Sequence, residues 1–204
     1  FNKATVAEVS TNHIAEAAGV SPGNLYYHYK NKEMIIRAIL ERMFVVFGEL
    51  WVLPEARQLN LEDLQNLFVR LFTLLWQFRF FDREQLSLMR RDPLLAARYQ
   101  EIQAQRLGEQ ERYFQRYIDD GVLITEDPDH YRSLITACWI LSNNWLGFVE
   151  MSGETVKPDH IYRGIDMIFV VISPYLATSH QQNLSHVLAR HDILDKDIFH
   201  DTRN

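Results

Sequence analysis

Side chains that can recognise a ligand are concentrated between residues 21 and 32. Asn24 offers an amide that can hydrogen-bond the edge of a base, and Tyr26 and His28 offer hydroxyl and imidazole donors for phosphate. Gly23 has no side chain, so the backbone there can approach another molecule closely. A helix with such residues on its outer side is too polar for a core position. These residue types favour contact with nucleic acid.

Two short helices joined by a turn would position these side chains. The first is expected to begin near Thr11, which we predict to cap it and to contact phosphate, because a helix N-terminus favours an anion. Gly19 should end this helix, because glycine adopts the left-handed conformation at the least cost. Ser21 should cap the second helix, which runs to about Tyr29. Two helices arranged in this way form a helix-turn-helix, whose second helix enters the major groove of DNA.

This part of the chain resembles the TetR family of bacterial transcription repressors. Members of that family carry the string Ile-Ala-x-x-Ala-Gly-Val-Ser-x-Gly-x-Leu-Tyr-x-His-Phe/Tyr-x-x-Lys. Here the string reads Ile14, Ala15, Ala18, Gly19, Val20, Ser21, Gly23, Leu25, Tyr26, His28, Tyr29 and Lys32. The match covers about the first 45 residues. The resemblance implies a three-helix DNA-binding head, whose first helix would mostly precede Phe1, and then a six-helix domain for ligand binding and dimerisation.

The residue types and the resemblance together predict the contacts with double-stranded operator DNA. Gly23 and Asn24 are expected at base edges, and Tyr26, His28 and Lys32 at phosphates. The predicted set is Thr11, Asn12, Ser21, Gly23, Asn24, Tyr26, Tyr27, His28 and Lys32. For Lys32 the alternative is an ordinary solvated lysine.

Long helices should make up the rest of the chain. Gly and Pro number only 8 and 6, which disfavours many short strands joined by turns. Apolar residues at helical spacing predict helices over 32–51, 61–80, 94–120, 128–151 and 161–176, with a shorter piece around 86–92. The expected fold class is therefore all-α. We expect a DNA-binding head over residues 1–48, an effector-binding and dimerisation domain over 49–178, and a polar tail over 179–204.

The interior of residues 50–150 combines many large aromatic residues with a few polar ones. This composition suits an apolar pocket with polar anchors, although most of these aromatic residues are expected to be ordinary core. The resemblance implies a cavity for a small effector, which we expect to be apolar or aromatic. The predicted contacts are Trp51, Phe72, Trp76, Arg79, Phe114, Trp139 and Asn143. The alternative is a solid core and a constitutive repressor.

The last two long helices carry more apolar residues than a single buried face on each helix would require. They would form the homodimer interface, with Trp145, Phe148, Ile165, Phe169 and Ile172 as the predicted contacts. Two such helices from each chain can form a four-helix bundle, the arrangement for which the family is known.

Charge and composition limit the possible classes of protein. The net charge of −6 argues against nucleic acid at first sight, but residues 1–37 carry four basic and three acidic residues, so the acidity is confined to the remainder. The single cysteine, Cys138, excludes an internal disulfide. No apolar run is long enough for a membrane span, and no basic start leads into an apolar run as in a signal peptide, so the expected compartment is a reducing cytoplasm.

We find no set of residues that suggests catalysis, a cofactor or a metal. Cys138 lies in an apolar stripe, which favours an inert buried thiol over a nucleophile. His186 and His191 are five residues apart and would not share a helix face. The favoured function is therefore a regulator, most simply a repressor that its effector releases from DNA. The alternatives are a helical small-molecule-binding module whose head no longer binds DNA and, less favoured, an enzyme that uses the same cavity.

Overall fold

The computed structural model describes residues 1–54, 57–125 and 127–181. Within these ranges the structure is helical, and its only extended pairing is one antiparallel bridge between Leu123 and Leu176, which confirms the all-α class. The helices are α1 (Thr11–Ala17), α2 (Pro22–His28), α3 (Lys32–Gly48), α4 (Leu61–Gln77), α5 (Arg79–Arg91), α6 (Pro93–Asp119), α7 (Pro128–Met151), α8 (His160–Ile172) and α9 (Thr178–Gln181), with short 3₁₀ turns at Glu49–Trp51 and Ser173–Tyr175.

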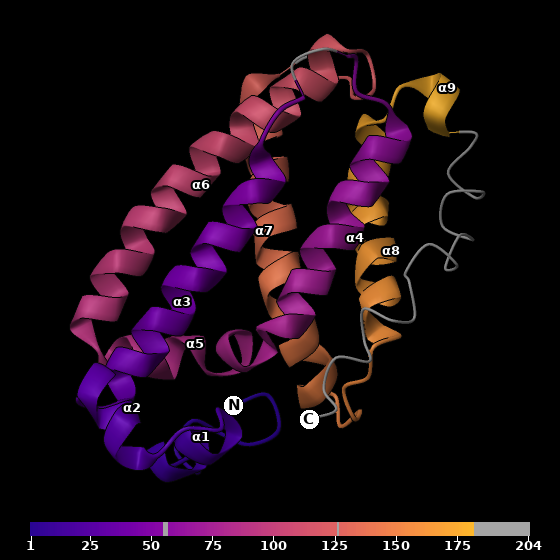
Figure 1. The fold of residues 1–204 in the computed structure, drawn as a ribbon. Helices are drawn as coiled ribbons and strands as arrows, with labels where there is room; N and C mark the ends of the chain where they lie inside the picture. Colours follow the sequence, from indigo (N-terminus) through magenta and orange to yellow (C-terminus); the bar gives the residue numbers. More distant parts are fainter. Residues whose placement is uncertain (55–56, 126, 182–204) are drawn as a thin grey trace.

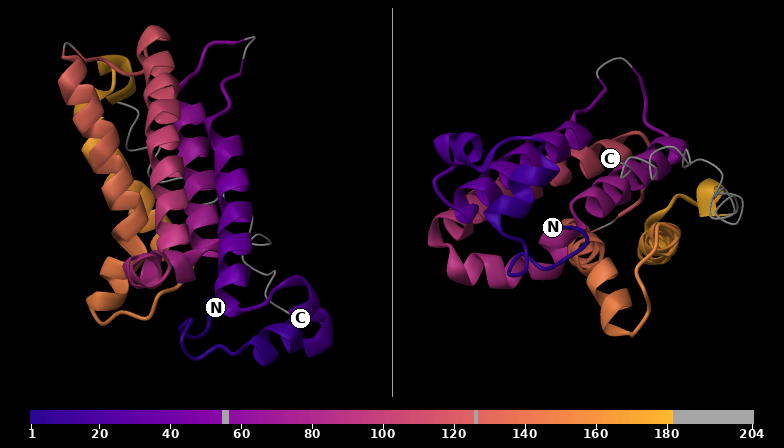
Figure 2. Two further views of the ribbon diagram at one scale, coloured as in Figure 1. Left: turned by 90° about the vertical axis from the view of Figure 1, so that its left-hand side faces the viewer. Right: turned by 60° about the horizontal axis from the view of Figure 1, so that its bottom comes forward.

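The two short helices α1 and α2 lie at one end of a bundle of long helices (Figure 1). Helix α3 leaves this head and runs along the bundle beside α6, in the same direction (Figures 1 and 2). Helices α4, α7 and α8 complete the bundle, and α5 crosses it close to the head. Helix α3 is therefore the element that joins the head to the body of the molecule.

Serine caps begin both helices of the head. Ser10 Oγ accepts a hydrogen bond from the His13 N–H at 3.2 Å, so Ser10 and not Thr11 is the N-cap of α1. The prediction for Thr11 as the cap is therefore wrong, because Thr11 is already the first helical residue. Ser21 caps α2 as predicted, with Oγ 3.2 Å from the Asn24 nitrogen. Gly19 makes the turn between the helices at φ +66°, the left-handed region that favours glycine.

Helix α3 contributes to two hydrophobic cores. Ile35 packs with Ala15 and Leu25 in the small core of the head. Leu40 and Phe44 belong to a second core, shared with residues of α5 and α6. A larger third core joins α4, α6, α7 and α8. Because one continuous helix enters the first two cores, the head cannot move without moving the near end of α3.

Polar contacts also hold α3 against α6. Asp92 is the N-cap of α6 and accepts hydrogen bonds from the N–H groups of Leu94 and Leu95. The same carboxylate pairs with Arg37 of α3 at 2.6 Å. One and two turns further along α3, Glu41 pairs with Arg98 at 2.7 Å, and the Phe44 carbonyl accepts a hydrogen bond from Arg106. These contacts form a polar seam, comprising Arg37–Asp92, Glu41–Arg98 and Phe44–Arg106.

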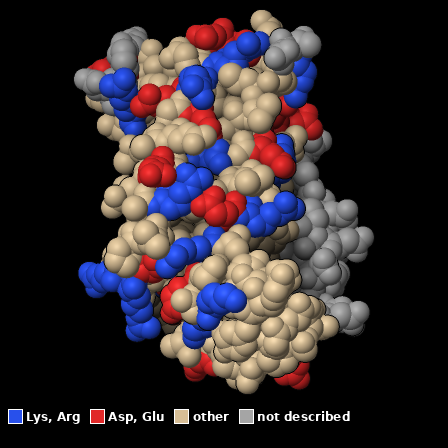
Figure 3. All heavy atoms as spheres, turned by 60° about the vertical axis from the view of Figure 1, so that its left-hand side comes forward, with Lys and Arg blue, Asp and Glu red and all other residues tan. Residues whose placement is uncertain are grey.

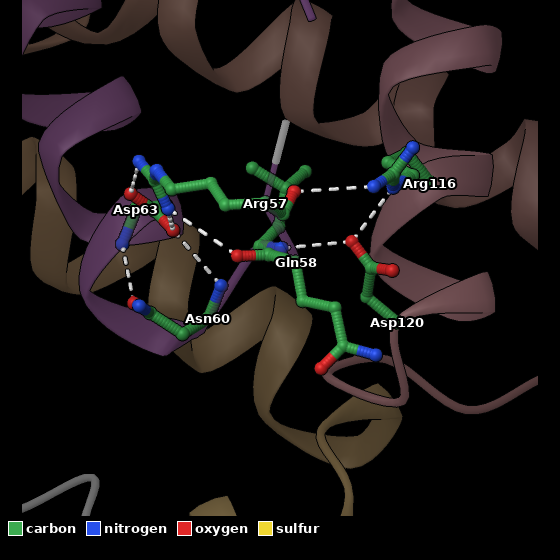
Figure 4. Close-up of polar contacts among 7 residues, drawn as sticks. Arg57, Gln58, Asn60, Asp63, Arg116 and Asp120 are labelled. Atoms are coloured by element: carbon green, nitrogen blue, oxygen red, sulfur yellow. Dashed lines mark hydrogen bonds and ion pairs between the residues drawn. The ribbon is translucent and has the colours of Figure 1, made fainter. Parts of the chain in front are cut away.

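A second polar network fixes the end of the bundle that lies away from the head (Figure 4). Asp120 accepts hydrogen bonds from the Leu59 N–H at 2.8 Å and from Arg116 at 2.7 Å. Arg116 also donates to the carbonyl of Arg57, whose guanidinium pairs with Asp63 at 2.6 Å. The connection that precedes α4 is thereby fastened to the end of α6.

Several predicted helix boundaries are wrong, including the end of the helix over 32–51, which stops at Gly48. The helix expected over 61–80 stops at Gln77, because Phe78 leaves helical geometry and the Arg79 guanidinium donates to the Trp76 carbonyl at the helix end. Helix α5 consequently begins at Arg79 and is longer than expected. The last long helix ends at Ile172 and not at residue 176, since a 3₁₀ turn that contains a proline follows it.

Within the predicted tail, residues 182–204 lie outside the described residues. No helix of the described part is long and apolar enough to cross a membrane.

Replacing Asp92 by alanine should destabilise the protein by about 1–3 kcal/mol at pH 7, because α6 loses its N-cap and Arg37 loses its partner. Burial opposes ionisation of Asp92, but Arg37 and the N–H groups of α6 outweigh it, so the pKa of this carboxyl lies below its usual value. Its stabilising effect should thus be complete above about pH 4 and disappear as the pH falls through the folded-state pKa.

Urea unfolding followed by circular dichroism measures this effect. Asp119→Ala is the matched control, because Asp119 is an exposed aspartate at the opposite end of the same helix. Equal losses in the two variants at pH 7 would contradict the assigned role of Asp92.

Candidate nucleic-acid interface and effector cavity

The predicted contact residues of α2 and its cap lie on the surface of the head. Ser21, Gly23, Asn24 and His28 are exposed, while Leu25 alone in α2 is buried. Tyr27 is 76% exposed, although tyrosine is a large side chain that a core would bury. The outer face of α2 therefore presents amide, imidazole and phenol groups to the surroundings.

Tyr26 and Thr11 lie at one place on this surface. The Tyr26 hydroxyl and Thr11 Oγ1 are 2.7 Å apart and share a hydrogen bond, which joins the beginning of α1 to the outer face of α2. Asn12 follows Thr11 and is exposed. The three predicted residues thus belong to one continuous surface with α2.

Lys32 has partners within the chain. Its Nζ donates to the carbonyls of Val6 at 2.5 Å and Val9 at 2.8 Å, and the residue is half-buried. Two of its three donors therefore hold the segment that precedes α1, so Lys32 is not an ordinary solvated lysine, and its contact with phosphate stays a prediction. Lys30, which was not predicted, is exposed just after α2, with Nζ 3.4 Å from the Tyr26 carbonyl. The sequence could have indicated Lys30 as a contact residue, because it is basic and only two residues from Lys32.

Charges are unevenly distributed over the surface. On the face shown in Figure 3, basic and acidic side chains alternate over the bundle, whereas the head at the lower end carries few charges. The head therefore offers mainly hydrogen-bonding and aromatic groups, with lysine at its margin.

A cavity of about 70 Å³ lies inside the bundle, between α3, α4, α5, α6 and α7. Four of the predicted effector residues line it: Trp51, Phe114, Trp139 and Asn143. Further aromatic residues of its wall, which include Phe47 and Phe81, come from α3 and α5. The aromatic composition of the interior thus indicated a cavity and part of its lining.

The other three predicted effector residues lie outside this cavity, and their contact with an effector stays a prediction. Phe72 is fully buried against α8, where a Cβ on Gly164 would overlap its ring. Trp76 and Arg79 lie at the corner between α4 and α5, with the guanidinium 4.2 Å from the indole ring, and line a separate surface depression. Helical periodicity placed all three on an inward face but did not specify their neighbours.

Five polar residues of the cavity wall were missed by the sequence analysis: Asp82, Gln103, Arg106, Gln110 and Ser142. Arg106 donates to the Phe44 carbonyl at 2.5 Å and also pairs with Glu109. The hydroxyl of Ser142 is buried and has no hydrogen-bond partner. A signal existed for Arg106, because it follows Tyr99 and Ile102 at helical spacing on the buried face of α6.

Most of the predicted dimer contacts are buried inside the chain. Phe169 and Ile172 have no exposed surface, and Trp145 and Ile165 are 8% exposed, so the prediction is wrong for these four. The reason is that α7 and α8 pack on each other and α8 packs on α4. Phe148 is 57% exposed. The large apolar side chains that α7 and α8 expose are Ile140, Phe148, Met151, Met167 and Val170.

The described residues contain no group of His, Cys, Asp and Glu side chains that could hold a metal ion. Cys138 is buried in the cavity wall, and burial raises the pKa of its thiol to about 12. The thiol is therefore protonated at neutral pH and is a poor nucleophile.

Comparisons with known proteins agree with this geometry. The family model described as "Bacterial regulatory proteins, tetR family" matches residues 1–39, and that described as "Bacterial transcriptional repressor" matches residues 48–184. A TetR-family transcriptional regulator from Marinobacter aquaeolei VT8 is a similar solved structure, with 29% identity, a TM-score of 0.78, and coverage of 89% of this chain and 88% of that one.

Two more distant structures share the fold. A TetR transcription regulator from Haloarcula marismortui ATCC 43049 is 15% identical, with a TM-score of 0.62 and coverage of 83% of this chain and 88% of that one. The chain of the SmeT–triclosan complex is 20% identical, with a TM-score of 0.56 and coverage of 87% of each chain. The family models together span most of the sequence, and the chain therefore belongs to the TetR family of bacterial transcription regulators.

Proposed function

We propose that the protein is a homodimeric repressor that a small, largely apolar effector releases from its operator. One observation carries this proposal: α3 extends without interruption from Lys32 in the head to Phe47 in the cavity wall. A change in the cavity can therefore reach the DNA-binding surface through a single rigid element.

The cavity supports binding of an apolar or aromatic effector. A volume of about 70 Å³ holds roughly five water molecules at about 10–15 Å³ each, which is less than most ligands need. An effector must therefore displace side chains of the wall as it enters. SmeT, a chain with the same fold, forms a complex with triclosan, which supports binding of a small molecule by this fold. The alternative of a solid core is disfavoured by the cavity itself.

Arg106 offers a physical route from the cavity to the head. It lines the cavity and holds the Phe44 carbonyl, three turns along α3 from Lys32. Gly48 of α3 lies close to the same guanidinium, and a Cβ added there would be 2.8 Å from Arg106 Nη2. An effector that displaces Arg106 would loosen the end of the polar seam nearest to the cavity and allow α3 to shift. The coupling free energy between an effector site and a DNA-binding site is typically about 1–3 kcal/mol.

The exposed apolar residues of α7 and α8 support a homodimer. Ile140, Phe148 and Met151 recur at helical spacing and share one face of α7, and Met167 and Val170 add exposed apolar surface on α8. Two heads would then contact two half-sites about one helical turn of DNA, ~34–36 Å, apart or somewhat further.

Gly23→Ala should leave the fold intact but weaken operator binding about tenfold, which corresponds to 1.4 kcal/mol. A Cβ at this position meets only Ser21 Oγ at 4.0 Å, and alanine is the better helix former by roughly 0.5–1 kcal/mol, so the protein itself gains nothing from glycine here. Mobility shifts on the DNA that flanks the gene measure the effect.

Gly108→Ala is the matched control, because a Cβ on this α6 glycine meets no atom within 4 Å. If Gly23→Ala binds as tightly as Gly108→Ala, α2 does not approach DNA at this residue. Should the wild-type protein shift no flanking DNA, the alternative of a head that has lost DNA binding is favoured.

Phe148→Glu should convert dimers into monomers in sedimentation velocity, because it places a charge in the centre of the proposed interface. Leu86→Glu, at a 61% exposed leucine of α5, introduces the same charge outside that interface and should remain dimeric. A Phe148→Glu variant that sediments as a dimer would move the interface to another surface.

Gly48→Ala should lower operator affinity by about 5- to 150-fold in the absence of any effector, the range of typical allosteric couplings. The new methyl group displaces the flexible end of Arg106 from Phe44, as we propose that an effector does. Fluorescence anisotropy with labelled operator DNA measures the change. An affinity equal to that of the Gly108→Ala control would refute this route.

A further inference from the structure

The polar side chains of the cavity wall lie almost entirely on two helices. Every wall residue that α3 or α4 contributes is apolar. Helix α6 contributes Gln103, Arg106 and Gln110, and α7 contributes Ser142 and Asn143. The cavity therefore has an apolar side, formed by α3 and α4, and a polar side, which comprises these residues of α6 and α7.

Two groups of the polar side are buried and lack a partner. Ser142 is 4% exposed, and its hydroxyl makes no hydrogen bond within the described residues. Gln110 is 7% exposed, and its amide likewise has no hydrogen bond in that part of the chain. Buried polar groups of folded proteins are nearly always hydrogen-bonded. Both groups are thus free to bind a ligand that enters the cavity.

The polar side offers acceptors as well as donors. Asn143 donates from Nδ2 to the Trp139 carbonyl at 2.8 Å, which leaves its Oδ1 as an acceptor. A glutamine amide has two N–H donors and one carbonyl oxygen, and a serine hydroxyl can donate or accept. A ligand group that both donates and accepts, such as an amide, matches this side better than a group that only accepts.

The charges of the wall do not favour an ionic ligand of either sign. The Arg106 guanidinium already pairs with Glu109 and donates to the Phe44 carbonyl, so an anion would have to compete for it. A cation drawn to Asp82, the acidic residue of the wall, would share the cavity with that guanidinium. Either ion would also lose its water on entry. An uncharged polar group avoids both costs.

We propose that the effector is an uncharged compound with an aromatic or apolar ring and one amide-like group. Its ring packs against the apolar side, and its amide hydrogen-bonds Gln110 or Ser142 on the polar side. This inference rests on the proposed function and specifies the ligand class of the same cavity. Because neither group has a partner within the described chain, the new hydrogen bond replaces no internal one.

The test compares probes that share one skeleton and differ in their polar group. At neutral pH benzamide is uncharged, benzoate is an anion and benzamidinium is a cation, while 2-phenylpropene forms no conventional hydrogen bond. Binding to the full chain is followed by the fluorescence of Trp51 and Trp139, which line the cavity. The wild-type protein should bind benzamide at least about tenfold more tightly than either ion, because each ion is desolvated without gaining a free counter-charge.

The double variant Gln110→Leu, Ser142→Ala removes both unpartnered groups. Its affinity for benzamide should fall by about two- to tenfold, the effect of one hydrogen bond, whereas its affinity for 2-phenylpropene should not fall. The matched control is Gln115→Leu, Ser133→Ala, which makes the same changes at exposed positions of α6 and α7 and should bind every probe as the wild-type does.

The ranking of the probes on the wild-type protein is independent of whether the variants fold. An ion that binds as tightly as benzamide, binding of no probe, or an unchanged affinity of the double variant for benzamide overturns the inference. The proposed repressor function is decided separately by the mobility shift on flanking DNA, which none of these outcomes affects.

Discussion

The architecture depends on the contact between α3 and α6. Helix α3 supplies Ile35 to the core of the head and Phe44 to the core that it shares with α5 and α6. The polar seam fixes the register of this packing, since each of its contacts joins a specific side chain of α6 or its cap to α3. Apolar packing alone is non-directional and would tolerate small slides of α3. Hydrogen bonds and ion pairs restrict those slides to discrete positions.

The contacts of the polar seam differ in how far they are buried. The Glu41–Arg98 pair is about half exposed on both sides and contributes little energy, as is usual for surface ion pairs. Asp92 and Arg106 are largely buried, so the contacts at the two ends of the seam are the costly ones to break. One of these ends lies near the head and the other in the wall of the cavity. A regulator with this arrangement can couple the two sites through few residues.

The sequence was sufficient to predict the helices and the helix-turn-helix, because both leave strong local patterns. Gly19 marks a helix end through its backbone geometry, Ser21 marks a helix start through its side-chain oxygen, and apolar spacing marks the inward faces. The errors in helix boundaries occurred where apolar spacing continues past the last helical residue. Arg79, for example, donates to the Trp76 carbonyl at the end of α4, an i,i+3 contact that apolar spacing does not indicate.

The candidate cavity was predicted only in part, for a related reason. Periodicity shows that Phe72 and Trp139 face inward, but only the packing of α4 on α8 separates a core residue from a cavity residue. Asp82 was overlooked beside Phe81, although it lines the cavity. A charge at a position that helical spacing places inward is the signal that deserved weight. The dimer contacts failed in the same way, since inward and outward apolar faces of α7 and α8 look alike in sequence.

The network of Asp120, Arg116 and Arg57 has a mechanical consequence. It fastens the connection before α4 at the far end of the bundle, where the 3₁₀ turn after α3 also lies. The 3₁₀ turn packs on α4 and α6, so it can act as the pivot of α3, whose 17 residues give an arm of about 25 Å. A tilt of roughly 5° would move the head by about 2 Å over this arm. The volume of an effector bound beside α3 would thus determine how far the head moves.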